Sequence, residues 1–75
     1  MFTTTYKTTA AGYILGAKVK FFSFDGDDLL TQRSGTVVQP RAAQFSRQDL
    51  LVIERPEGGY RSFLKKNIYS FEYVG

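Results

Sequence analysis

The sequence predicts a small all-β domain, and three observations carry that prediction. The chain has 75 residues, which is room for one domain. No segment sustains an apolar i, i+3, i+4, i+7 pattern over three turns, whereas short β-branched and aromatic runs separated by turn residues dominate. A chain this short buries only about 60% of its unfolded surface. Seven Phe and five Tyr must therefore supply much of a thin core.

The first expected strand runs from Tyr13 to Phe24. Polar and apolar residues alternate over Lys18–Phe21, and the phenylalanines at 21, 22 and 24 then interrupt the alternation. This interruption predicts a bulge or a bend that buries both faces of the strand. Asp25-Gly26 follows as a strong turn signal, because glycine adopts positive φ without strain.

The second expected strand is Ser34–Gln39. Before it we expect a polar excursion over residues 27–32, with its leucines at 29 and 30 packed beneath it. Gly35 permits a close approach or a bend within the strand. Pro40 ends it, because proline has no N–H to donate.

The third and fourth expected strands form a hairpin. Residues 41–48 read as a loop or a single helical turn, and the third strand, Leu50–Arg55, begins with four consecutive apolar residues. Such a run predicts burial on both faces and hence a central strand. Pro56–Gly59 is the best hairpin turn in the chain, since proline presets one φ and two glycines accept positive φ. The fourth strand, Tyr60–Leu64, returns antiparallel to the third.

The last expected strand completes the sheet. Lys65–Asn67 reads as a brief 3₁₀ turn, and the fifth strand, Ile68–Val74, has Tyr69, Phe71 and Tyr73 on one face.

Five short strands with these connections favour an SH3-like or Sm-like barrel over residues 10–75, because closure removes exposed strand edges. An OB-type barrel, which needs a longer chain and a helix, is the alternative. The Thr-rich residues 1–9 form either an extra N-terminal strand or a disordered arm.

The composition excludes much chemistry. The chain has no Cys and no His, which excludes a disulfide scaffold, a Cys/His zinc site, a cysteine nucleophile and a Ser-His-Asp triad. Asp25–Asp28 lacks the register and terminal Glu of an EF-hand, so a solvated turn is favoured over a cation site. Asp49 and Glu54 lie on opposite faces of a strand and do not converge. We therefore expect no enzyme, no cofactor and no metal.

The sequence favours a cytoplasmic protein without a membrane segment. The longest uncharged stretch, Thr8–Ala17, is too short and too rich in Thr and Gly to span a membrane. The N-terminus lacks the pattern of a secretory signal, and the absence of cysteine fits a reducing compartment.

Charge and aromatic residues point to anionic partners. The net charge is +3, and the pI is about 9.4. The segment from Tyr60 to Lys66 interleaves aromatic and basic residues, and it makes Tyr60, Arg61, Lys65 and Lys66 candidates for contact with nucleic acid. Aromatic faces stack on bases, and Arg and Lys neutralise phosphates. In the alternative interpretation, the apolar residues of this strand fill the core and its cations are simply solvated.

The order of motifs over about residues 18–70 resembles a WYL domain. That family has an aromatic strand, an Arg leading into a strand that ends at Pro, and an ending with the spacing of Arg61 to Ile68. Where its Trp-Tyr-Leu signature stands, this chain has Asp49-Leu50-Leu51. The resemblance implies a small barrel that binds nucleotides or single-stranded nucleic acid and regulates transcription, with its basic ligand contacts at Arg33 and Arg61.

Two functional hypotheses follow. The first is a non-enzymatic module that binds nucleic acid, with single strands favoured, through Arg33, Arg61, Lys65 and Lys66, and that stacks bases on Tyr60. The second is a protein-binding adaptor or inhibitor of the phage or mobile-element type. Its acidic Asp25–Asp28 loop would meet a basic host protein. Self-association through an edge strand is a third expectation.

Overall fold

The chain folds into one antiparallel sheet, and the all-β prediction is confirmed. A computed structural model describes residues 7–24, 29–40 and 47–74. Within these residues the only helical elements are two 3₁₀ turns, η1 (Arg47–Asp49) and η2 (Lys65–Asn67). No helix in this part of the chain has the length and apolar character needed to cross a bilayer. The strands are β1 (Lys18–Phe24), β2 (Leu30–Val38), β3 (Leu50–Glu54), β4 (Tyr60–Leu64) and β5 (Tyr69–Tyr73).

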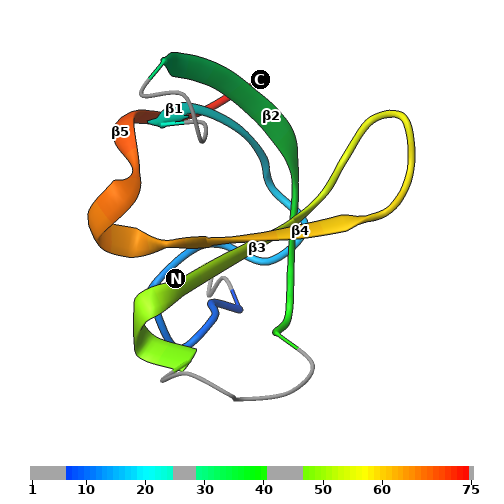
Figure 1. The fold of residues 1–75 in the computed structure, drawn as a ribbon. Helices are drawn as coiled ribbons and strands as arrows, with labels where there is room; N and C mark the ends of the chain where they lie inside the picture. Colours follow the sequence, from blue (N-terminus) through cyan, green and yellow to red (C-terminus); the bar gives the residue numbers. More distant parts are fainter. Residues whose placement is uncertain (1–6, 25–28, 41–46, 75) are drawn as a thin grey trace.

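The sheet has the order β4-β3-β2-β1-β5 and curves along β2 (Figure 1). The first part of β2, Leu30–Thr36, pairs with β1, and its end, Thr36–Val38, pairs with β3. Gly35 lies beside this change of partner. A Cβ atom at Gly35 would lie 2.6 Å from the carbonyl oxygen of Glu54. The prediction that Gly35 permits a close approach is therefore confirmed.

The sheet is barrel-like but open. Among the described residues β4 pairs only with β3, and β5 pairs only with β1, so the expected closure of the sheet is wrong. The turn η2 separates the two edge strands, and β5 is irregular where it meets β1. Lys20 pairs with Glu72 but Phe22 pairs with Tyr69, which is a step of two residues on β1 and three on β5. The extra residue lies in β5, where Ser70 has a φ of 53°, and not in the first strand as predicted.

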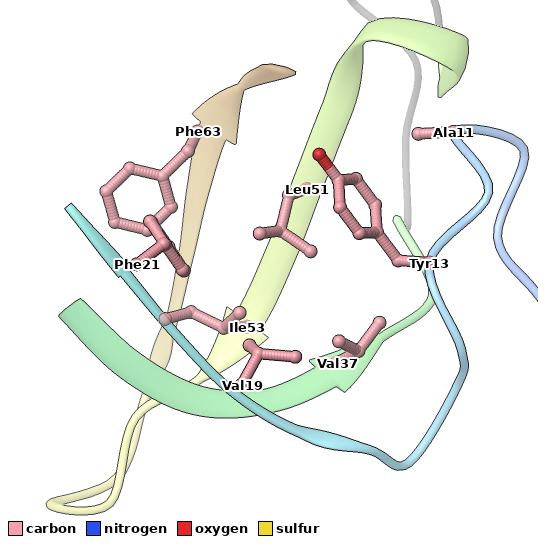
Figure 2. Packing of buried hydrophobic residues seen from close by; sticks show 8 residues of the cluster. All are labelled: Ala11, Tyr13, Val19, Phe21, Val37, Leu51, Ile53 and Phe63. Atoms are coloured by element: carbon pink, nitrogen blue, oxygen red, sulfur yellow. The ribbon is translucent and has the colours of Figure 1, made fainter. Parts of the chain in front are cut away.

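The core lies on the inner face of the curved sheet (Figure 2). Phe21 is its centre, with the ring of Phe63 edge-on at 5.0 Å and the ring of Phe71 stacked at 6.3 Å between centroids. Phe21 and Phe63 lie at one end of this core, and Ala11 and Tyr13 lie at the other. The buried cluster comprises Ala11, Tyr13, Val19, Phe21, Val37, Leu51, Ile53 and Phe63.

The first hairpin differs from its prediction at both ends. β1 begins at Lys18 and not at residue 13, because Gly16 takes a φ of 78° and turns the chain before it. Its alternation continues to the end, so Ser23 is buried and Phe24 faces solvent. Leu29 and Leu30 are 66% and 51% exposed, and are not packed beneath a loop. β2 already begins at Leu30, since pairing with β1 continues to the Leu30–Phe24 pair. The expected Asp25-Gly26 turn lies outside the described residues.

The second hairpin matches its prediction closely. β3 lies between β2 and β4 and is buried at 50, 51 and 53, as expected for an inner strand. The backbone N–H of Arg55 donates to the carbonyl oxygen of Gly59 at 2.9 Å, and the N–H of Gly58 donates to that of Arg55 at 2.9 Å. Gly58 and Gly59 have φ values of 101° and 84°, which confirms the reason for two glycines there.

The last strand keeps only part of its expected pattern. The 3₁₀ turn over Lys65–Asn67 is confirmed, and β5 is one residue shorter at each end than expected. Phe71 packs inward on Phe21, whereas the ring of Tyr69 lies 5.4 Å from that of the outward Phe24. The predicted common face of the β5 aromatics holds for Phe71 and Tyr73, whose rings lie 5.0 Å apart. It is wrong for Tyr69, because the extra residue in β5 reverses the alternation between Tyr69 and Phe71.

Residues 7–15 form a small hairpin over one end of the core. The N–H of Leu15 donates to the carbonyl oxygen of Lys7 at 2.9 Å, and the N–H of Thr9 donates to that of Tyr13 at 2.8 Å. The N–H of Gly16 then donates to the carbonyl oxygen of Val37 at 3.0 Å, which attaches the hairpin to the end of β2. The expected boundary between residues 9 and 10 falls inside this hairpin, and residues 1–6 lie outside the described part of the chain.

Candidate nucleic-acid interface

Arg33 lies on the inner face of the sheet although it is charged. The period of two along β2 places it on the same face as Val37, directly opposite Phe21 of β1. Its Nε–H donates to the Ser23 hydroxyl at 3.0 Å, and its Cζ lies 5.8 Å from the centroid of the Phe63 ring. The half-buried guanidinium is thereby held at the end of the core.

Arg61 approaches the same aromatic ring from β4. It pairs with Ile53 of β3, and its Cζ lies 5.2 Å from the centroid of Phe63. Two guanidinium groups therefore lie near one ring, which also packs against Phe21 in a T-shaped arrangement. Each cation–π contact at such a site contributes about 0.5–1 kcal/mol. Phe63 positions both arginines because the core fixes its ring.

Arg55 is a third cation at this end of the sheet, and the sequence analysis missed it. It follows Ile53 by two residues and so continues the inward face of β3 into the hairpin turn. A Cβ atom at Gly59 would lie 2.9 Å from a terminal nitrogen of its guanidinium, which shows how closely the side chain folds over the turn. Its Nε lies 3.7 Å from a carboxylate oxygen of Glu57. Both side chains are exposed, so this ion pair is weak.

The three arginines line one pocket of about 210 Å³, which we call the arginine pocket. Among the lining residues that the structure describes, three guanidinium groups and one carboxylate sum to a formal charge of +2. Two of its lining residues are apolar and buried: Ile53 is 1% exposed and Phe63 is 8% exposed. Guanidinium forks match phosphate and carboxylate oxygens in two-point hydrogen bonds, so this lining suits an anion. The lining residues are Gln32, Arg33, Ser34, Ile53, Arg55, Pro56, Glu57, Arg61 and Phe63.

Tyr60 does not belong to this pocket. Alternation along β4 places it on the face opposite Arg61 and Phe63, where it lines a separate apolar hollow with Val52 and Pro40. Its ring is exposed. A base stacked on Tyr60 would therefore lie on the other side of the sheet from the three guanidinium groups.

Lys65 and Lys66 lie at the far end of β4. The ammonium of Lys65 donates to the carbonyl oxygen of Ala11 at 3.0 Å and lies 5.8 Å from the centroid of the Tyr13 ring. These two contacts link the N-terminal hairpin to η2. Burial raises the pKa of the Tyr13 phenol above its ordinary value of 10.0, and the nearby Tyr73 raises it further. Lys66 is exposed beside Lys65 on a hollow that also contains Asp49.

The five residues predicted for the interface thus divide into three groups. Arg33 and Arg61 share the arginine pocket, Tyr60 lies on the opposite face, and Lys65 and Lys66 lie near the N-terminal hairpin. One sequence signal points to Arg55. Arg55 is two residues after Ile53 and therefore lies on the same face of the strand. The predicted hairpin turn brings Arg61 opposite Ile53, and hence close to Arg55.

The outer face of the first hairpin carries an exposed apolar patch. Phe24 pairs with Leu30 across β1 and β2, and its ring contacts that of Tyr69. Leu29, which precedes Leu30 in the chain, is exposed as well. We call Phe24, Leu29, Leu30 and Tyr69 the apolar patch.

Within the described part of the chain, no three acidic side chains gather in a way that would hold a metal ion. No protein-family model, curated protein or solved structure matches the chain. The resemblance to WYL domains, and the assignment to the SH3-like or Sm-like class, therefore stay predictions.

Proposed function

We propose that this protein is a non-enzymatic, cytoplasmic module that binds single-stranded nucleic acid through the arginine pocket. The observation that carries the proposal is the convergence of Arg33, Arg55 and Arg61 on one pocket, where Glu57 is the only carboxylate among the lining residues that the structure describes. Arg33 lies on β2, Arg61 lies on β4 and Arg55 lies at the hairpin turn, so none of the three cations is adjacent to another in sequence.

Electrostatics favours an anionic ligand at this point. Like charges held at one end of a sheet repel each other, and an anion between them converts the repulsion into charge-assisted hydrogen bonds. The repeating phosphates of a nucleic acid supply such anions at close spacing, and a basic protein attracts them over several ångströms. A role in transcription regulation rests on the resemblance to WYL domains alone and is part of the proposal on that basis.

Fluorescence anisotropy tests the proposal with a labelled single strand of about ten nucleotides at about 50 and 200 mM salt. Arg61→Gln removes one pocket charge while keeping side-chain length. Lys20→Gln is the matched control, since it removes one charge from the outer face, where Lys20 pairs with Glu72 at 2.7 Å. We expect Arg61→Gln to weaken binding roughly tenfold at the lower salt and to reduce the salt slope by roughly one contact, and Lys20→Gln to change binding less than about twofold. Equal losses in both variants, or no binding at the lower salt, would contradict the proposal.

The apolar patch favours a second function, the binding of a protein. Phe24, Leu30 and Tyr69 are exposed on one face of the sheet, and Leu29 is exposed beside them in the sequence. The sequence between Phe24 and Leu29 carries three Asp residues. A partner with apolar side chains flanked by basic residues would complement both features. The placement of Tyr60, Lys65 and Lys66 away from the arginine pocket also favours this function.

Affinity capture after nuclease treatment tests the second function. One stoichiometric basic protein should be recovered with the wild type and lost with Phe24→Ser. It should persist with Tyr60→Ser, which removes an exposed ring outside the patch. Capture that disappears with nuclease treatment would assign the interaction to nucleic acid instead.

A further inference from the structure

We infer that the edge of β4 binds an extended protein segment as an added antiparallel strand, in which apolar residues alternate with residues that include an acidic one. This ligand goes beyond the proposed function, because it is a peptide held by backbone hydrogen bonds. Three features carry the inference: the backbone groups that β4 directs away from β3, the difference between the two edges of the sheet, and the unlike faces of β4.

The backbone of β4 directs hydrogen-bonding groups away from the sheet at Ser62. In an antiparallel pair of strands, residue pairs that exchange hydrogen bonds alternate with pairs that do not. The N–H of Arg55 donates to the carbonyl oxygen of Gly59 at 2.9 Å, so this pair is of the hydrogen-bonded kind. Two residues further along β4, Arg61 belongs to the same kind of pair, and the next residue, Ser62, does not. The N–H and carbonyl of Ser62 therefore face the outer edge, where β4 has no neighbouring strand among the described residues.

The two edges of the sheet differ in how well they accept another strand. Proteins protect exposed edges with bulges, prolines and lysines, among other devices. β5 has such protection, because its extra residue, close to the positive φ of Ser70, breaks the regular spacing of the edge. β4 pairs with β3 without a register shift, and Tyr60–Leu64 contains neither proline nor lysine. The regular edge of β4 is therefore the one that suits the addition of a strand.

An added strand would meet a different chemistry on each face of β4. Residues directly opposite each other in an antiparallel pair share one face of the sheet. On the outer face, Tyr60 and Ser62 line the apolar hollow, which has a volume of about 440 Å³, and Tyr60 is 54% exposed. On the inner face, Arg61 is exposed and its guanidinium lies over the ring of Phe63. An apolar residue is therefore favoured opposite Ser62, and an acidic residue is favoured opposite Arg61.

Charge favours an acidic segment over a second copy of this chain. Each copy carries a net charge of +3, and Lys65 and Lys66 follow β4 directly. A second copy paired at this edge would bring its own Arg61 and both lysines to the same place, where like charges repel. A segment that carries a carboxylate instead gains attraction from the same cations.

The test uses the acetylated and amidated peptide Val-Thr-Val-Glu-Val, titrated into the full chain labelled with ¹⁵N. When its glutamate lies opposite Arg61 in an antiparallel register, its central valine lies opposite Ser62 and directs its backbone groups toward β4. We expect chemical-shift changes concentrated on β4, and at saturation we expect the Ser62 amide to exchange its hydrogen at least about tenfold more slowly. The reordered peptide Val-Val-Val-Thr-Glu has the same composition and charge, and it should bind roughly tenfold more weakly.

Methylation of the peptide's backbone nitrogens tests the strand pairing without altering the protein. A methyl group on the nitrogen of the central valine should abolish binding, because this nitrogen faces Ser62. A methyl group on the nitrogen of the glutamate, which faces away, should change the affinity less than about threefold. Arg61→Gln should weaken the binding of the glutamate peptide roughly fivefold and leave that of its glutamine analogue unchanged. Lys20→Gln, the matched control on β1, should leave both unchanged.

Several results would overturn the inference. One is equal binding of the two methylated peptides, and another is a set of shifts on the apolar patch in place of β4. Protection of the Ser62 amide that grows with protein concentration in the absence of peptide would mean that a second copy occupies the edge. A single strand of about ten nucleotides that shifts the β4 signals, when the peptide does not, would overturn the inference and leave the proposed function standing. A peptide that binds when no single strand does would support the inference and contradict the proposed function.

Discussion

Replacing Gly35 by alanine tests whether the curvature of β2 depends on a missing side chain. The added Cβ would lie 2.6 Å from the carbonyl oxygen of Glu54 and 3.0 Å from Cδ1 of Ile53. The Ile53 methyl group is the end of a side chain and has some freedom to move. The Glu54 carbonyl does not, because it belongs to the backbone of β3, where Glu54 pairs with Thr36. The substitution must therefore displace β2 from β3.

The magnitude follows from two opposing effects. Alanine restricts the unfolded chain more than glycine does, and this stabilises the folded state by about 0.4–1 kcal/mol. Overpacking of a well-packed site costs about 1–3 kcal/mol, and a contact with backbone belongs at the upper end of that range. The net expectation is a destabilisation of about 1–2 kcal/mol. For a domain of this size, this lowers the melting temperature by roughly 5–15 °C.

Thermal unfolding by circular dichroism and urea denaturation measure this effect. The urea midpoint should fall while the m-value stays constant, since only the stability changes. Ser34→Ala is the matched control, because Ser34 is the exposed neighbour on the other face of β2. It should change stability by less than about 0.5 kcal/mol. If Gly35→Ala were as stable as the wild type, the close approach would not constrain the sheet, and our explanation of its curvature would be wrong.

Two further predictions concern the N-terminal end of the core. Burial favours the neutral phenol of Tyr13, so its pKa is higher in the folded chain than in the unfolded chain. Stability should therefore be full below pH 10 and fall as the pH rises above it, which urea titrations at about pH 8 and 11 will show. Tyr13→Phe should reduce that fall, and an unchanged fall would contradict the role of Tyr13. Lys65→Met should destabilise the chain by about 0.5–1.5 kcal/mol through the lost contact with Ala11, and Lys66→Met should not. Equal denaturation midpoints for these two variants would refute the role of Lys65.

Features encoded by local turn chemistry could be predicted from the sequence. The chain turns at Pro56–Gly59, where two adjacent glycines allow positive φ. The position of this turn also sets the pairing of β3 with β4 on either side of it. The extra residue in β5 could not be predicted, because Ser70 carries no local signal for a positive φ. Its conformation is set by pairing with β1, a contact distant in sequence. That the sheet stays open could not be predicted either, because it also depends on the pairing of β5 with β1.

The candidate site was predicted in part, for a related reason. Proximity in sequence grouped Tyr60 with Arg61, but consecutive residues of a strand point to opposite faces. Proximity also grouped Lys65 with Arg61, although its ammonium contacts a segment more than fifty residues earlier. Arg55 was missed because a cation beside a turn is normally solvated. Its place in the pocket depends on the register that brings Arg61 opposite Ile53.

The core and the arginine pocket share one face of the sheet, and this explains why the cations gather where they do. Phe63 packs against Phe21 in a T-shaped arrangement, and the guanidinium groups of Arg33 and Arg61 lie within 5.8 Å of the centroid of its ring. In a closed barrel an inward arginine would have to be buried, which is unfavourable without a paired anion. Here the inner face continues past the last buried side chains to an open end. The side chain of Arg55 is 42% exposed there, whereas a terminal nitrogen of Arg33 is buried. The same opening that leaves the sheet incomplete thus gives an anion access to the exposed guanidinium groups of Arg55 and Arg61.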